Sequence, residues 1–327
     1  CSRFVCHPSP VPSPLRLCSA GWSGMLQRLI QLVDTIPTHM RSGRVMRGPA
    51  ARTRSDIRFV RLDRAMVRCR QLGDGRSLVF ATDPPVPLEC YDALFDALAP
   101  RFRVTVFEMP GFGASLPRAG MRLSMRDAIG LVARFLEQLG SGPHSLVMPC
   151  VLGLVGLGLA RQHPRLIGQL VLSQTADWAG TQRWLAKRDP NGVLRRPVLG
   201  QLALAALRRK RIDAWYRTAV ADAAMVQPLV KATLENFDHG GCFCLASGFQ
   251  DCLSNHQNQL APVPHDTLLI WGDADPSHRG TGFAATQALA PNAELVCVEG
   301  AGHFPELERP GAVVGHLGRF LANGRSG

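Results

Sequence analysis

Short apolar runs alternate with amphipathic stretches along most of the chain from residue 57 onward. Runs typical of buried strands lie at 57–62, 66–71, 78–81, 103–109, 145–149, 166–173, 267–271 and 294–298. Helical patterns fall between them at 89–99, 125–139, 151–161, 281–289 and 311–321, and Ser124 is placed to cap the second of these. Because buried strands that alternate with helices form a parallel sheet covered on both faces, the pattern predicts an α/β fold with a mostly parallel sheet.

The alternation stops between residues 178 and 264. Three helical patterns occur in this stretch without a convincing strand, at 198–208, 212–224 and 229–237. We therefore predict that residues 178–264 form a helical cap inserted between two strands of the sheet, above a substrate pocket. The core of the fold is then expected over residues 56–177 and 265–327.

Charge is concentrated at the start of the chain. Residues 1–70 hold 13 arginines and three aspartates, so they account for +10 of the formal net charge of +12. Few aromatic residues are interleaved with these arginines, which argues against a nucleic-acid surface, and residues 7–14 alternate proline with other residues. Residues 1–55 are therefore predicted to be a basic extension without stable structure. No apolar run approaches the roughly 18 residues of a membrane span, so no membrane partner is expected.

Ten cysteines are present among 327 residues, but their spacing lacks paired C-x-x-C units. Several lie in apolar runs, where cysteine behaves as a small hydrophobic residue, and a reducing cytoplasm is the expected compartment. Cys242, Cys244, Cys252 and His256 form a further group that could be interpreted as a metal cluster. Its C-x-C spacing fits zinc sites poorly, so the sequence predicts neither a metal nor a cofactor.

Three chemically capable residues each follow the end of a predicted strand. Cys150 follows 145–149, Asp275 lies four residues past Trp271, and His303 follows 294–298. The carboxyl ends of parallel strands meet at one edge of a sheet, so these side chains are expected to converge there. An imidazole beside a thiol generates a thiolate nucleophile, and a carboxylate orients the imidazole.

Four segments in chain order carry a resemblance to a known superfamily. They are Met109-Pro110-Gly111-Phe112-Gly113-Ala114-Ser115, Ser145 to Gly153, Trp271-Gly272-Asp273-Ala274-Asp275-Pro276 and Gly300-Ala301-Gly302-His303-Phe304. Over residues 57–322 the chain resembles the α/β-hydrolase superfamily, with cysteine where most members carry serine. The resemblance implies that Cys150 is the nucleophile, His303 the general base and Asp275 the orienting carboxylate. It also implies that the backbone N–H groups of Asp83 and Val151 are the oxyanion donors.

The sequence departs from the superfamily pattern at two places. The nucleophile is usually flanked by glycines at positions occupied here by Met148 and Leu152, and Gly153 comes one residue later. The strand end that usually reads His-Gly is Ala81-Thr82, followed by Asp83. A carboxylate beside a developing oxyanion is unfavourable unless it turns away or is protonated. These departures keep open a second hypothesis, a ligand-binding protein that has lost turnover.

Two other aspartates compete for the role of the acid. Asp177 follows the strand at 166–173, where some superfamily members carry their acid, and Asp273 lies in the same turn as Asp275. We favour Asp275, directly before Pro276, and expect Asp273 to cap the turn.

The resulting hypothesis is a cofactor-independent hydrolase or acyl-transfer enzyme. It would act on an ester or thioester of a mainly apolar small molecule through an acyl-enzyme intermediate, and carbon–carbon bond cleavage is a further alternative within the superfamily. Four aromatic residues of the cap are candidates for the substrate pocket, namely Trp178, Trp184, Trp215 and Phe237. The sequence predicts no oligomeric state.

Overall fold

The computed structural model describes residues 54–117, 123–238, 244–253, 261–281 and 283–323, together with Met25 and Leu29. The predicted basic extension, residues 1–55, lies almost entirely outside the described residues.

One mixed sheet runs through the molecule, with strand order β1-β2-β4-β3-β6-β7-β8-β9 and β5 paired to β2. From β4 to β9 all neighbours are parallel, whereas β1, β2 and β4 pair antiparallel. The strands are β1 Ile57–Leu62, β2 Ala65–Leu72, β3 Ser77–Ala81, β4 Arg103–Phe107, β5 Leu116–Pro117, β6 His144–Pro149, β7 Ile167–Ser173, β8 Thr267–Gly272 and β9 Ala293–Val298. The predicted α/β class with a mostly parallel sheet is confirmed.

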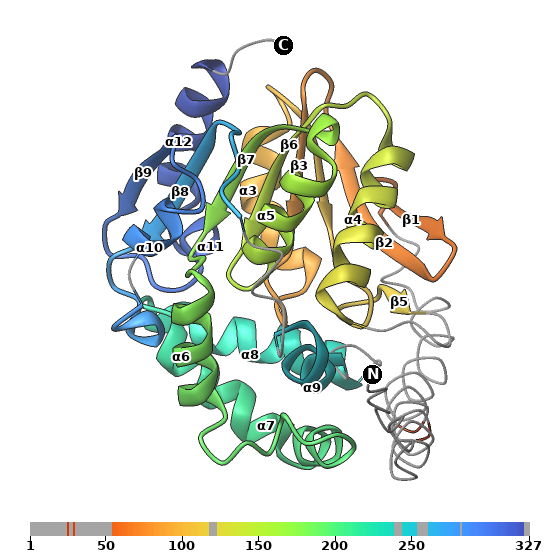
Figure 1. The fold of residues 1–327 in the computed structure, drawn as a ribbon, viewed down its shortest axis with the longest axis vertical. Helices are drawn as coiled ribbons and strands as arrows, with labels where there is room; N and C mark the ends of the chain where they lie inside the picture. Colours follow the sequence, from red (N-terminus) through yellow and green to blue (C-terminus); the bar gives the residue numbers. More distant parts are fainter. Residues whose placement is uncertain are drawn as a thin grey trace, which may run out of the picture.

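Helices cover both faces of this sheet. Helix α5 lies in front of the sheet and α3 behind it (Figure 1); α5 packs beside α4, and α3 packs beside α12. The helices are α3 Asp92–Leu98, α4 Met125–Leu139, α5 Leu152–Gln162, α6 Trp178–Arg188, α7 Leu199–Ala219, α8 Ala223–Asp238, α9 Cys244–Ser247, α10 Phe283–Gln287, α11 Pro305–Glu308 and α12 Pro310–Asn323. Short 3-10 helices lie at Leu88–Tyr91, Pro164–Leu166 and Pro276–His278, and a π-helix at Gly248–Cys252.

Strand β6 is the centre of the sheet and carries the chain to the candidate nucleophile. It pairs with β3 on one side and with β7 on the other, and all six of its residues are buried. A strand covered on both faces needs apolar side chains in both directions, which explains the continuous apolar run in the sequence. The α5 helix follows and is buried over most of its length.

The turn after β4 is built around a buried carboxylate. Glu108 accepts hydrogen bonds from the N–H groups of Leu88 (3.0 Å) and Ala114 (2.9 Å). Gly113 has φ +55°, and a Cβ there would lie 2.0 Å from the Glu108 side chain, so only glycine fits. This fixed turn carries Met109 and Phe112 to the pocket described below.

Helices α6 to α9 occur between β7 and β8 in the chain and lie together below the sheet, at the end where β7 leads into α6 (Figure 1). The predicted helices at 198–208 and 212–224 are wrong as separate elements, because α7 runs unbroken over Leu199–Ala219. The apolar pattern is interrupted at Arg209-Lys210-Arg211, but these residues favour helix and let it continue. None of the helices in the described part of the chain combines the length and apolar character needed to cross a lipid bilayer.

Candidate active site

Cys150 lies at the sharp turn between β6 and α5. Its φ is +47°, an uncommon backbone conformation for a residue with a side chain. The conformation is held from both sides, because the Cys150 N–H donates to the Ser173 carbonyl at 2.7 Å and its carbonyl accepts from the Thr175 hydroxyl at 3.0 Å. Backbone strain of this kind is concentrated at functional sites, where the surrounding structure maintains it.

The turn is accommodated by glycines of α5 rather than by glycines flanking Cys150. A Cβ on Gly156 would lie 3.0 Å from the Met148 side chain, and one on Gly153 would lie 2.0 Å from the Thr175 hydroxyl oxygen. The helix can therefore approach the sheet closely even though Met148 and Leu152 replace the usual small residues. Gly153 and Gly156 of α5 thus provide the space that glycines at positions 148 and 152 would usually provide.

Asp275 and His303 are in direct contact with each other. The Nδ1 atom of His303 lies 3.0 Å from Oδ2 of Asp275, which also accepts a hydrogen bond from the Gln174 side-chain amide at 2.7 Å. The Ser277 N–H donates to Oδ1 at 2.7 Å. Burial by itself raises the pKa of Asp275, but the charge on His303 and the hydrogen bonds outweigh it and hold the pKa well below its ordinary value. Asp275 is therefore a carboxylate.

A second histidine, which the sequence analysis did not single out, shares this carboxylate. His278 ends the 3-10 helix Pro276–His278, and its Nδ1 lies 2.9 Å from Oδ2 of Asp275. Its ring stacks on that of His303 with the centroids 4.9 Å apart. Burial lowers the pKa of His278, so it is a neutral donor to Asp275. Its place three residues after Asp275 was the available signal.

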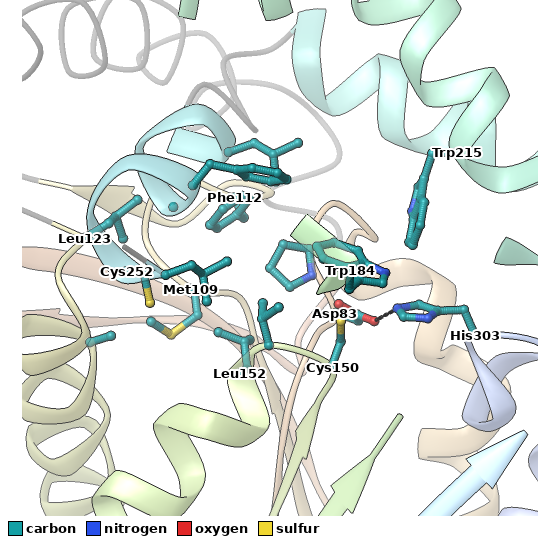
Figure 2. A pocket seen from close by; sticks show the side chains of 17 residues that line it. Asp83, Met109, Phe112, Leu123, Cys150, Leu152, Trp184, Trp215, Cys252 and His303 are labelled. Atoms are coloured by element: carbon teal, nitrogen blue, oxygen red, sulfur yellow. Dashed lines mark ion pairs between the residues drawn. The ribbon is translucent and has the colours of Figure 1, made fainter. Parts of the chain in front are cut away.

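Asp83 faces the other nitrogen of His303. Its Oδ2 lies 3.2 Å from Nε2, and Figure 2 shows the two side chains pointing at each other beside Cys150. The Asp83 side chain has thus not turned away from the site. Its backbone N–H donates to the Tyr91 hydroxyl at 2.9 Å. The geometry therefore argues against Asp83 as an oxyanion donor.

The charges on this cluster shift two pKa values in the same direction. Burial opposes the charged form of His303, but the sulfur of Cys150 and the carboxylates of Asp275 and Asp83 outweigh it and raise the pKa well above its usual value. Burial and the Asp83 charge also raise the pKa of Cys150, against the opposing effects of His303 and the Val151 N–H. The raised pKa values favour the protonated form of each group, the imidazolium of His303 and the thiol of Cys150.

Two groups of potential metal-ligand atoms occur among the described residues. One is Asp83, Cys150 and His303, the other Asp275, His278 and His303, and within each the atoms lie within 4.8 Å of one another. Cysteine, histidine and aspartate are the side chains that bind zinc. Of the four residues that the sequence offered as a metal cluster, Cys242 and His256 lie outside the described residues.

The site opens into an apolar cavity of about 690 Å³, a volume that includes the open space at its mouth. Of the four predicted pocket residues, Trp184 and Trp215 line it (Figure 2), whereas Trp178 packs half-buried against the core and Phe237 lies inside the core. The other lining residues are Asp83, Pro84, Met109, Phe112, Leu123, Ala128, Cys150, Val151, Leu152, Leu245, Gly248, Phe249, Cys252, Leu253 and His303.

The two competing aspartates have other partners. Asp177 caps α6 by accepting the Gly180 N–H at 2.8 Å. Asp273 accepts the Gly300 N–H at 2.7 Å, which ties its turn to the loop that precedes His303. Asp275 is the aspartate that contacts His303 through Nδ1.

Comparison with known proteins places the chain in a family. Residues 73–316 match the model of the Alpha/beta hydrolase family. The pimeloyl-(acyl-carrier protein) methyl ester esterase of Nitrosomonas europaea is 26% identical over 261 residues, which cover 75% of this chain and 96% of that protein.

Solved structures agree on the fold. The epoxide hydrolase of Bacillus megaterium has a TM-score of 0.66 at 15% identity, covering 81% of this chain and 100% of its own. Est816, described as an N-acyl homoserine lactone degrading enzyme, has a TM-score of 0.62 at 20% identity, covering 80% of this chain and 100% of its own. With a family match across most of its length and the same arrangement of sheet and helices, the chain belongs to the alpha/beta hydrolase family and is a hydrolase.

Proposed function

We propose that this protein hydrolyses a carboxylic ester or thioester of a mainly apolar small molecule, with Cys150 as nucleophile. The observation that carries the proposal is the strained Cys150 turn at the end of β6, placed beside a histidine whose Nδ1 is held by a carboxylate. This arrangement of nucleophile, base and orienting acid performs acyl transfer on unrelated folds. The esterase activity named for the relative supports cleavage of an ester.

The reaction proceeds in two steps through a thioester. Neutral His303 takes the thiol proton at Nε2 while the Cys150 sulfur attacks the carbonyl carbon, and it then returns that proton to the departing alcohol or thiol. A water molecule next attacks the acyl-enzyme, its proton passes to His303, and the acid product leaves as the proton returns to Cys150. Asp275 keeps Nδ1 protonated and stabilises the imidazolium. The Val151 N–H, which faces the Cys150 sulfur, is the proposed oxyanion donor.

Asp83 determines when this reaction can begin. Nε2 accepts the thiol proton only after His303 has lost its own, and Asp83 stabilises the protonated form. The fraction of enzyme ready for attack therefore grows as pH rises through the elevated pKa of His303. Asp83 also places negative charge near the developing oxyanion, which slows the chemical step.

Intact-mass spectrometry tests the covalent intermediate. Wild type is incubated with p-nitrophenyl esters and acyl thioesters, and an acyl mass increase that decays with time is expected. Cys150→Ala should show no adduct and no turnover. Cys252→Ala is the matched control because Cys252 lines the same pocket, and it should keep the adduct. Turnover in Cys150→Ala at the wild-type rate would remove Cys150 as nucleophile.

The position of the Asp83 carboxylate also favours the second candidate function, which is a ligand-binding protein without turnover. A carboxylate at this position disfavours both the thiolate and the oxyanion. This candidate predicts no acyl adduct on Cys150 at any pH, together with saturable binding of an uncleaved ester to the cavity.

A further inference from the structure

A second cavity adjoins the active-site pocket. Its volume is about 860 Å³ including its mouth, and it shares five lining residues with the first, namely Pro84, Trp184, Trp215, Leu245 and Phe249. Its lining also contains Lys187, Arg188 and Arg211, and no acidic residue. Trp184 and Trp215 therefore lie between the two cavities. The cavity beside Cys150 is apolar, whereas the second cavity has the three cationic side chains in its lining.

Arg188 is the cation of this second cavity that packs against both tryptophans. It lies in the last turn of α6, with its guanidinium carbon 4.9 Å from the ring centroid of Trp215 and 5.9 Å from that of Trp184. Its Nε is buried without a hydrogen-bond partner. Burial lowers the pKa of Arg188, because it removes water from around the charged guanidinium.

Neighbouring charges do not neutralise Arg188. No carboxylate of the described residues lies within ion-pair distance of its guanidinium; the adjacent Asp189 is instead 3.6 Å from Arg195. Lys187 donates to the Arg279 carbonyl at 2.5 Å. A partly buried cation without a partner is unfavourable by itself and becomes favourable when a ligand supplies an anion.

Arg188 is close to the reacting groups as well. Asp275 is near enough for its negative charge to stabilise the charged form of Arg188. Trp215 connects the two regions, because Arg188 lies over its ring while its edge packs against His303 with centroids 5.0 Å apart. A substrate bound at Cys150 can therefore extend past the tryptophans to Arg188.

We propose that Arg188, with Arg211, binds an anionic oxyacid group of the substrate, a carboxylate or a phosphate, at the end away from the scissile ester. This inference rests on the proposed ester hydrolysis and names its substrate class: an ester or thioester with an apolar middle and a negatively charged end. The apolar middle contacts Trp184 and Trp215, and the planar guanidinium pairs with two oxygens of the anion.

Matched esters test the proposal. The kcat/KM values are compared for three p-nitrophenyl esters of equal chain length, ending in a free carboxylate, a phosphate or a neutral methyl ester. Wild type should prefer at least one anionic ester by about tenfold or more, as expected for one charge-assisted bidentate contact, and the two anionic arms distinguish carboxylate from phosphate. Arg188→Met should lose this preference, so that its kcat/KM values for the anionic and the neutral esters become equal.

Arg183→Met is the matched control, because Arg183 is exposed on the same helix; it should keep the preference. Equal kcat/KM for the three esters in wild type would overturn the inference and leave the proposed function intact. If no ester is hydrolysed and Cys150 stays unmodified, the proposed function fails. The inference is then tested by titration calorimetry with the free acids that correspond to the two anionic esters, one ending in a second carboxylate and one in a phosphate. Binding that Arg188→Met weakens about tenfold supports it, and equal binding by both proteins overturns it.

Discussion

At the scale of single residues, the contact between Asp83 and His303 is the feature that most distinguishes this site. His303 lies between two carboxylates, Asp275 at Nδ1 and Asp83 at Nε2. In the proposed mechanism the first orients the ring for catalysis, whereas the second holds a proton on the nitrogen that must accept one. The same carboxylate raises the pKa of Cys150. If His303 is the general base, as we propose, Asp83 moves the pH range of activity to higher pH.

Replacing Asp83 with asparagine should move activity toward lower pH. Loss of one carboxylate lowers the pKa of His303, so the neutral base forms at lower pH, and the pKa of Cys150 falls because a repelling charge is gone. The pH dependence of kcat/KM for a p-nitrophenyl ester is measured for wild type and Asp83→Asn. The wild-type acid limb should lie above about pH 6.5, the ordinary pKa of histidine, and the limb of the variant should lie below that of wild type.

Asp273→Asn is the control for this experiment, because Asp273 is exposed and its partner is the Gly300 N–H. Its pH profile should follow that of wild type. Identical limbs for Asp83→Asn and wild type would show that Asp83 does not set the protonation of His303.

At the scale of elements, the packing of α5 on the sheet decides whether Cys150 keeps its conformation. Gly153 leaves room for Thr175, whose hydroxyl donates to the Cys150 carbonyl. The glycine, the threonine and the nucleophile thus form one contact chain between α5 and the segment after β7. Glycines within a helix usually reduce its stability, and here the close approach of helix and sheet requires them.

Gly153→Ala should therefore reduce both stability and activity. The added Cβ would lie 2.0 Å from the Thr175 hydroxyl oxygen, and overpacking of a buried site costs about 1–3 kcal/mol of unfolding free energy. Urea unfolding and esterase assays measure the two effects. Thr175→Ala introduced into Gly153→Ala should recover part of the lost stability by removing the clash. Additive losses in the double variant would show that the two residues do not compete for space.

The sequence alone predicted the strands well, because each buried strand appears as a short apolar run. The convergence of Cys150, Asp275 and His303 follows from strand ends in a parallel sheet, so it is visible without coordinates. The contact of Asp83 with His303 depends on which way a side chain points after its strand, and no periodicity carries that information. Helix α7 was divided wrongly because charged residues interrupt the apolar pattern without interrupting the helix. Arg188 was missed because an unpaired cation is recognised only when its neighbours are known.

At the scale of the whole molecule, the segment after His303 introduces a buried acid beneath the site. Glu306 of α11 is 5% exposed and accepts a hydrogen bond from the Ser173 hydroxyl at 3.0 Å. Burial, with a contribution from the Asp83 charge, raises its pKa from 4.5 to about 7. Because the folded protein favours the neutral carboxyl, ionisation above neutral pH destabilises the fold.

Glu306→Gln should stabilise the protein at alkaline pH. In wild type the penalty for ionising Glu306 appears above pH 4.5 and is complete above about pH 7, and a difference of roughly 2.5 pKa units corresponds to about 3 kcal/mol. The variant should gain up to this amount at about pH 8 and nothing at about pH 4. Urea unfolding at both pH values measures it. Glu299→Gln, an exposed change, should be neutral at both; an equal gain from that control would refute the assignment to Glu306.

The aromatic neighbours of the site give the molecule an optical property. Trp184 stacks on His278 with centroids 6.0 Å apart, and the edge of Trp215 packs against His303. A protonated imidazole in contact with an indole quenches its fluorescence, whereas the neutral ring does so weakly. Emission should therefore brighten as His303 loses its proton, so that the charge state of the proposed base is visible in the unliganded protein, without a substrate or an attached dye.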